Sequence, residues 1–220
     1  VKEYGLKGVY LESHENGRVY VVDGMDVKRH ATIPMAACWT PVNRPTSHST
    51  IPMAIADIRE SASVAHFYGK PHVAAESFTA DGWEGDAYSF TPARLKEVAD
   101  VELASGVNQF FIHECSHQPL DDCRPGLGLL GYGQWFNRHE TWAEQAGAWM
   151  DYLARSSALL SMGENVADVL VYYGEDTNAT ARYGLEPFQI PTGYNYDFIN
   201  PSGLFELKVV ECLSFEIRIP

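Results

Sequence analysis

A helix followed at once by a strand can be read in residues 55–76, IADIRESASVAHFYGKPHVAAE. Apolar residues recur there at helical spacing until Gly69 ends the pattern. The HVAA run that comes next has the composition of a strand, and Glu76 follows it directly. We therefore predict a helix over residues 55–68 and a strand over residues 72–76 that ends in a carboxylate.

The rest of the chain continues this alternation. We predict further strands at residues 9–12, 31–37, 107–112 and 166–173, and further helices at residues 92–105 and 140–162. After Gly174 the chain reads as a loop until Leu204. Strands and helices that alternate in this way predict right-handed βαβ units, a parallel sheet and an α/β fold.

Three of the predicted strands lead into a glutamate, namely Glu12, Glu76 and Glu114. In a (β/α)8 barrel the carboxyl ends of the strands ring one site, so these side chains would converge. In a doubly wound sheet they would line a crevice instead. The pattern by itself leaves both architectures open.

The composition excludes several classes of function. Twenty-nine Asp and Glu residues against 16 Lys and Arg give a net charge of −13, and so acidic a surface repels the backbone of nucleic acids. No apolar run reaches the roughly 18 residues that a membrane-spanning helix needs. The four cysteines include no CxxC pair, so we expect free thiols. We therefore expect neither a nucleic-acid partner nor a membrane partner.

Residues 113–117, HECSH, match the HExxH signature of zinc proteases. That chemistry needs a helix, which places the two histidines one turn apart on one face. Here a predicted strand runs directly into His113, and Pro119 follows His117 closely. We therefore predict no helical zinc site and keep a zinc hydrolase only as a less favoured alternative. The two histidines could still hydrogen-bond a ligand.

Residues 126–131, GLGLLG, match the GxGxxG pattern of dinucleotide-binding folds. No strand precedes them, although that fingerprint requires one. We favour a glycine-rich loop at an active site over a dinucleotide site.

A set of longer segments carries a family resemblance. They are residues 58–79 (IRESASVAHFYGKPHVAAESFT), 106–113 (GVNQFFIH), 117–119 (HQP), 125–126 (PG), 136–142 (FNRHETW), 166–170 (VADVL) and 190–200 (IPTGYNYDFIN). In this order they resemble the α-L-rhamnosidases of glycoside hydrolase family 106. The resemblance covers most of the chain from Gly5 to Asn200.

The resemblance implies the C-terminal half of a (β/α)8 TIM-type barrel, followed by the start of a second α/β domain. Residues 1–163 would supply barrel strands five to eight, and residues 164–220 would begin the incomplete second domain. The number of predicted strands agrees with half a barrel. A closed barrel needs eight strands and about 250 residues, and this chain offers only four strands of the barrel type. We therefore expect a fragment of a longer protein, for which a secreted or periplasmic location would be compatible with the sequence.

The resemblance also implies an inverting hydrolysis of terminal α-L-rhamnosides, with a rhamnose-containing glycan or glycoside as the partner. Glu76 matches the general base, and Glu12 would orient the substrate or tune the acid. The general acid would lie upstream of Val1, so the isolated chain is expected to be inactive. A sugar-binding or scaffold protein without chemistry is the alternative.

Six further residues are expected to contact the sugar. Hydroxyl ligands would be His113, Glu114, His117 and Gln118, and stacking walls would be Trp39 and Trp135. Some members of the family use calcium, but no segment here has a calcium-loop pattern, so no metal ligand is assigned.

Overall fold

The computed structural model describes residues 2–5, 9–11, 23–40, 51–80, 88–123, 126–129, 132, 136–175 and 190–208. Within these ranges the strands are β1 (Val9–Leu11), β2 (Ile33–Trp39), β3 (Ala74–Thr79), β4 (Gln109–Ile112), β5 (Val169–Tyr172) and β6 (Tyr196–Ile199). The helices are α1 (Gly24–Lys28), α2 (Ile51–Phe67), α3 (Pro92–Ser105), α4 (Gly147–Leu160) and α5 (Pro201–Glu206), with 3-10 turns at Lys2–Tyr4 and Ala143–Gln145. None of the described helices is long and apolar enough to cross a membrane.

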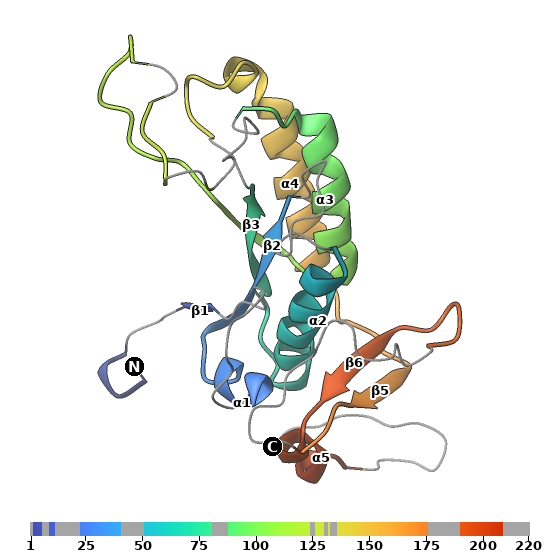
Figure 1. The fold of residues 1–220 in the computed structure, drawn as a ribbon. Coiled ribbons are helices and arrows are strands. Elements are labelled where there is room, and N and C mark those ends of the chain that lie inside the picture. The colour runs from blue at the N-terminus through green and yellow to red at the C-terminus, as the bar shows by residue number, and fades with distance from the viewer. Residues whose placement is uncertain are drawn as a thin grey trace.

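Strands β1 to β4 form one parallel sheet in which neighbours in space are also neighbours along the chain (Figure 1). The register aligns Met35 of β2 with Ala74 of β3, and Ala74 with Gln109 of β4. The predicted α/β class and parallel sheet are therefore confirmed. A doubly wound sheet reverses its strand order at a switch point, and these four strands show no reversal.

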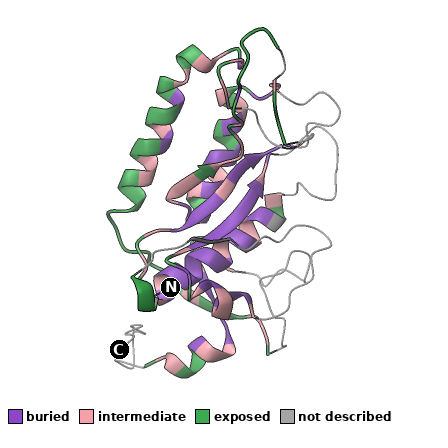
Figure 2. Ribbon diagram, turned by 90° about the vertical axis from the view of Figure 1, so that its left-hand side faces the viewer, coloured by how far each residue is buried: buried purple, intermediate pink, exposed green. Residues whose placement is uncertain are grey.

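Helices α2, α3 and α4 lie against one face of this sheet (Figure 1). The core fills the space between them, and Figure 2 shows the central strands as largely buried. Strand residues such as Ala36, Cys38 and Ala75 meet helix residues such as Ile58 and Leu95 there. The opposite face of the sheet, turned away from these three helices, is called the far face.

Helix α3 begins and ends where the sequence predicts. Thr91 has an extended backbone as the N-cap and Pro92 takes the first helical position. Gly106 closes the helix with φ of 120°, and a Cβ there would lie 2.7 Å from the Cβ of Ala62 in α2. Glycine is thus required both by the left-handed backbone and by the close approach of the two helices.

Several predicted boundaries are wrong. Helix α2 begins at Ile51 and not at residue 55, and the predicted helix 140–162 is a 3-10 turn followed by the shorter α4. Strand β3 ends at Thr79, because its last residues continue to pair with β2. Glu76 therefore lies within β3. The prediction that it ends the strand is wrong; it was based on the change from apolar residues to a charged one at this point.

The second sheet consists of β5 and β6, which pair in parallel. Strand β5 covers only part of the predicted range 166–173, and its residues alternate between half-buried and exposed, so it is not buried on both faces as predicted. The predicted loop after Gly174 is also wrong, since β6 and α5 lie there. The missed signal is Asn200-Pro201: the Asn200 side chain accepts the Gly203 amide at 2.9 Å, and the proline opens α5.

Helix α2 lies between the main sheet and the second sheet (Figure 1). On the side of the second sheet, the Phe198 amide donates to Ser63 Oγ at 2.8 Å. Nδ1 of His66 lies 2.9 Å from Oδ1 of Asp197. These contacts join α2 to β6 through buried and half-buried polar groups, and not through apolar packing alone.

Lys28 of α1 is fully buried between two carboxylates of α2. Its Nζ lies 2.7 Å from Asp57 Oδ1 and 3.0 Å from Glu60 Oε1. Burial lowers the pKa of the Lys28 ammonium, but the charges of Asp57 and Glu60 outweigh this effect and hold the pKa above its ordinary value. Asp57 Oδ2 also accepts the Ala37 amide at 2.9 Å, so the same group connects α1, α2 and β2.

Glu102 of α3 is a buried carboxyl group on the helix side of the main sheet. Ser77 Oγ of β3 donates to its Oε2 at 2.5 Å. Burial raises the pKa of Glu102 to about 8, so the group is mostly protonated at neutral pH. Burial, and then the neighbouring Glu102, also raise the pKa of the Cys38 thiol.

Replacing Lys28 by Met should lower the free energy of unfolding by about 3–5 kcal/mol, because Asp57 and Glu60 would remain buried without their cation. The matched control is Lys96→Met, which removes an exposed pair with Asp100 and should cost little. Urea denaturation of both variants measures the difference. Equal losses would show that the buried ion pair does not stabilise the fold.

Glu102→Gln should remove a pH dependence of stability. The folded pKa of about 8 exceeds the ordinary value of 4.5, so the folded state holds a proton that the unfolded chain releases between these values. Stability from this group is complete below the lower pKa and is lost as the pH rises through the upper one. The urea midpoint of the wild type should therefore fall relative to that of Glu102→Gln from pH 5 to pH 8.5. The exposed Glu97→Gln should show no such divergence, and a constant difference for Glu102→Gln would refute the raised pKa.

Candidate active site

The far face of β2, β3 and β4 carries a single carboxylate. Its residues alternate with the core residues of the same strands, and they are Met35, Ala37, Trp39, Ala74, Glu76, Thr79, Gln109 and Phe111. Glu76 is the only Asp or Glu in these three strands, and it is half-buried. It pairs with Ala37 on one side and with Phe111 on the other. An acidic group is thus held among apolar neighbours on a rigid sheet.

A β-bulge at Phe78 decides which residues of β3 reach the far face. The register with β2 shifts just before Trp39, so that Trp39 pairs with Thr79. Phe78 has φ of 67°, a left-handed value that is unusual for a bulky residue, and its ring is fully buried in the core. Thr79 therefore lies on the same face as Glu76, and its Oγ1 donates a hydrogen bond to Glu76 Oε1 at 3.3 Å.

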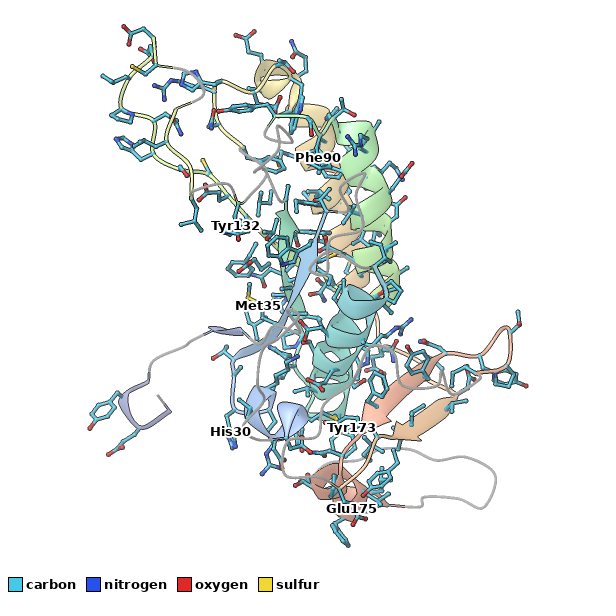
Figure 3. All side chains as sticks on the ribbon, viewed as in Figure 1. His30, Met35, Phe90, Tyr132, Tyr173 and Glu175 are labelled. Atoms are coloured by element: carbon cyan, nitrogen blue, oxygen red, sulfur yellow. The ribbon has the colours of Figure 1, made fainter. Side chains whose placement is uncertain are left out.

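Trp39 and Tyr132 form an aromatic pair at the far face. Their ring centroids are 5.8 Å apart and the rings are nearly perpendicular, at 83°. Figure 3 shows Tyr132 and Met35 on the side of β2 and β3 that is turned away from the helices. The sequence predicted Trp39 as a stacking wall but not Tyr132. The signal that could have found Tyr132 is its place directly after the glycine-rich segment 126–131.

His113 follows β4 directly and remains beside β3, because its amide donates to the Ser77 carbonyl at 2.9 Å. No helix forms over residues 113–120, so the HExxH match lacks the helix that its zinc site requires, as predicted. Nδ1 of His113 is buried and has no hydrogen-bond partner among the described residues, whereas His117 is exposed. A buried ring nitrogen without a partner is a group that a bound ligand could satisfy.

Glu114 and Gln118 hold together the loop that follows β4. Glu114 Oε1 accepts the Leu129 amide at 2.8 Å and the Ser116 hydroxyl at 2.7 Å. Gln118 is 7% exposed, and its amide group bonds to both the amide and the carbonyl of Leu127, at 2.9 and 2.5 Å. These contacts engage polar atoms that the sequence had assigned to sugar hydroxyls, and they give both residues a role in closing the loop.

Two of the predicted site residues, Glu12 and Trp135, lie outside the described residues. Among the described residues, no group of three or more His, Cys, Asp and Glu side chains is placed to hold a metal ion. Some members of the family use calcium, but we assign no calcium ligand in this chain and derive no chemical step through a metal.

Known proteins and protein families include relatives of this chain. A family model, Glyco_hydro_106, described as alpha-L-rhamnosidase, matches residues 1–213. A protein of Formosa agariphila named "Putative beta-glucuronidase" is 44% identical over 149 residues, which are 67% of this chain and 12% of that protein. The solved structure of a rhamnosidase from Novosphingobium sp. PP1Y is 47% identical with a TM-score of 0.73, over 84% of this chain and 17% of that one. The chain thus spans a small part of the length of both relatives.

Gly126→Ala should open the loop that Gln118 closes. A Cβ at this position would lie 1.9 Å from Gln118 Oε1, and the backbone φ of 91° already disfavours any side chain. Amide hydrogen exchange over residues 126–129 should become at least about tenfold faster, because the bond from the Leu127 amide would be lost. The control is Gly163→Ala, where nothing lies within 4 Å. Unchanged exchange in Gly126→Ala would show that Gln118 does not fasten this loop.

Proposed function

The chain belongs to glycoside hydrolase family 106, the alpha-L-rhamnosidase family, and we propose that it forms half of the catalytic barrel of an enzyme that hydrolyses terminal α-L-rhamnosides. The observation that carries this proposal is the position of Glu76. It is the only carboxylate in β2, β3 and β4, it is half-buried on the far face, and the described residues engage only its Oε1.

The barrel is supported by strand order and by helix placement. A (β/α)8 barrel keeps its strands in chain order and its helices on the outside, and β1 to β4 with α2, α3 and α4 follow both rules. The far face then corresponds to the barrel interior. We assign residues 1–163 to the barrel and residues 164–220 to the start of the following domain, which begins with the second sheet.

Glu76 is the proposed general base of an inverting reaction. Its carboxylate takes a proton from a water molecule while that water attacks the anomeric carbon and the bond to the leaving oxygen breaks. A second carboxyl group, roughly 6.5–9.5 Å away, protonates the leaving oxygen. We expect that acid in the preceding part of the barrel, and we expect Glu12, which follows β1 in the sequence, to orient the substrate or tune the acid.

The surroundings of Glu76 suit a neutral sugar. Trp39 and Tyr132 offer aromatic surface, and the unpartnered Nδ1 of His113 offers a hydrogen bond to a sugar hydroxyl. His117 is exposed and free to reach a substrate, whereas Glu114 and Gln118 act mainly through the loop. Strands β2, β3 and β4 contain no Lys or Arg that would neutralise the carboxylate of a glucuronide, the substrate that the name of the Formosa relative suggests.

Glu76→Gln in the protein at its full encoded length should lower kcat on an aryl α-L-rhamnoside by at least about a thousandfold. The amide keeps the shape of the side chain but cannot accept a proton, so the melting temperature should change little. The exposed Glu97→Gln of α3 serves as the matched control and should retain wild-type turnover. Steady-state kinetics and thermal denaturation of the three proteins test the proposal.

Three outcomes would contradict it. Retention of more than about a tenth of wild-type kcat, a loss below about 1.4 kcal/mol of barrier, would move the base to Glu12 or Glu114. Binding of L-rhamnose without turnover by the wild type would favour the sugar-binding alternative. Cleavage of an aryl β-glucuronide in preference to the rhamnoside would replace the proposed substrate.

A further inference from the structure

We propose that Thr79 is a positioning residue for Glu76: its hydroxyl holds Oε1 of the carboxylate and leaves Oε2 to meet the attacking water. This inference rests on the proposed function, because it takes Glu76 as the general base. Nothing in the sequence pattern suggests it, since residues 76 and 79 of a regular strand would point to opposite faces of the sheet.

The first argument is that the two side chains bond to each other. Among the described residues, the Thr79 hydroxyl is the one hydrogen-bond partner of the Glu76 carboxylate, and Glu76 is the one partner of that hydroxyl. Thr79 is 2% exposed, so water does not compete freely for its hydroxyl. A buried donor aimed at a single oxygen orients the carboxylate.

The second argument is the strained backbone that creates the contact. Phe78 adopts φ of 67°, which a bulky residue avoids unless the surrounding structure imposes it. Its ring packs parallel to Phe110 at 5.8 Å and also contacts Trp149 of α4 at 5.8 Å. The core thus holds Phe78 on the helix side, and the bulge turns Thr79 to the far face beside Glu76. The contact between Thr79 and Glu76 gives this backbone strain a function, because it orients the carboxylate.

The third argument concerns the other groups near Glu76 that could act on its carboxylate. Strand β2 places Met35, Ala37 and Trp39 on the far face, and none of them titrates. Strand β4 places Gln109 and Phe111 there, so the nearest titratable groups along that strand are His113 and Glu114, beyond its end. In the sequence, Glu12 follows β1. Replacing Thr79 alters none of these three residues, so a difference between Thr79→Val and Thr79→Ser reports on the hydroxyl.

The test is Thr79→Val, which keeps the shape and removes the donor, with Thr79→Ser as the variant that keeps the donor. Thr79→Val should lower kcat about tenfold with a smaller change in KM, because the carboxylate loses the hydrogen bond that orients it. Thr79→Ser should restore most of the lost kcat. Thr79→Ala should show the same loss as Thr79→Val and replaces it if that variant does not fold.

The outcomes separate this inference from the proposed function. Glu76→Gln, measured in parallel, should abolish turnover; if it does not, the base is elsewhere and both proposals fail. If Glu76→Gln is inactive but Thr79→Val keeps the wild-type kcat, only the role of Thr79 is wrong. An equal loss of kcat in Thr79→Val and Thr79→Ser would reduce Thr79 to a packing residue and overturn the inference.

Discussion

Helix α2 carries buried charge, and that charge determines what can pack around it. Asp57 and Glu60 are fully buried, so they require a buried cation, which Lys28 of α1 supplies at 2.7 and 3.0 Å. Asp57 also accepts the Ala37 amide and thereby places β2. On the other side of the helix, Ser63 accepts an amide of β6. Polar contacts thus fix the position of both sheets relative to one helix. If either sheet moved, Asp57 or Ser63 would lose its backbone partner.

Contacts on the helix side of β3 fix the residues that this strand places on the far face. Its helix side is held by Ser77, which bonds to the mostly protonated Glu102, and by the buried ring of Phe78. The left-handed backbone at Phe78 costs on the order of 1–3 kcal/mol, which the packing of the aromatic core offsets. Glu76 and Thr79 consequently share one face, on a strand that cannot shift without unpacking the core behind it. A carboxylate used in catalysis needs such a support, because small displacements of a reacting group are costly.

The loop after β4 shows how a family resemblance and a structure inform one another. The resemblance suggested Glu114 and Gln118 as ligands of the sugar, whereas the geometry engages them in closing the loop through Leu129 and Leu127. His113 is different, since no residue that the structure describes bonds to its buried Nδ1. The family resemblance therefore suggests which residues to consider, and their hydrogen-bond partners distinguish residues that shape the loop from residues that remain available to a ligand.

Features that depend on short segments can be predicted from the sequence. Pro92 and Gly106 delimit α3 through local capping, and the alternation of strands and helices predicts the parallel sheet. Glu76 is a candidate site residue because of the apolar run before it and the family resemblance, and its role remains a proposal. The tertiary structure alone decided that β3 continues to Thr79, that Thr79 meets Glu76, and that β5 pairs with β6. The physical reason is that strand ends, bulges and register are set by pairing and packing with residues distant in the sequence, which no local pattern encodes.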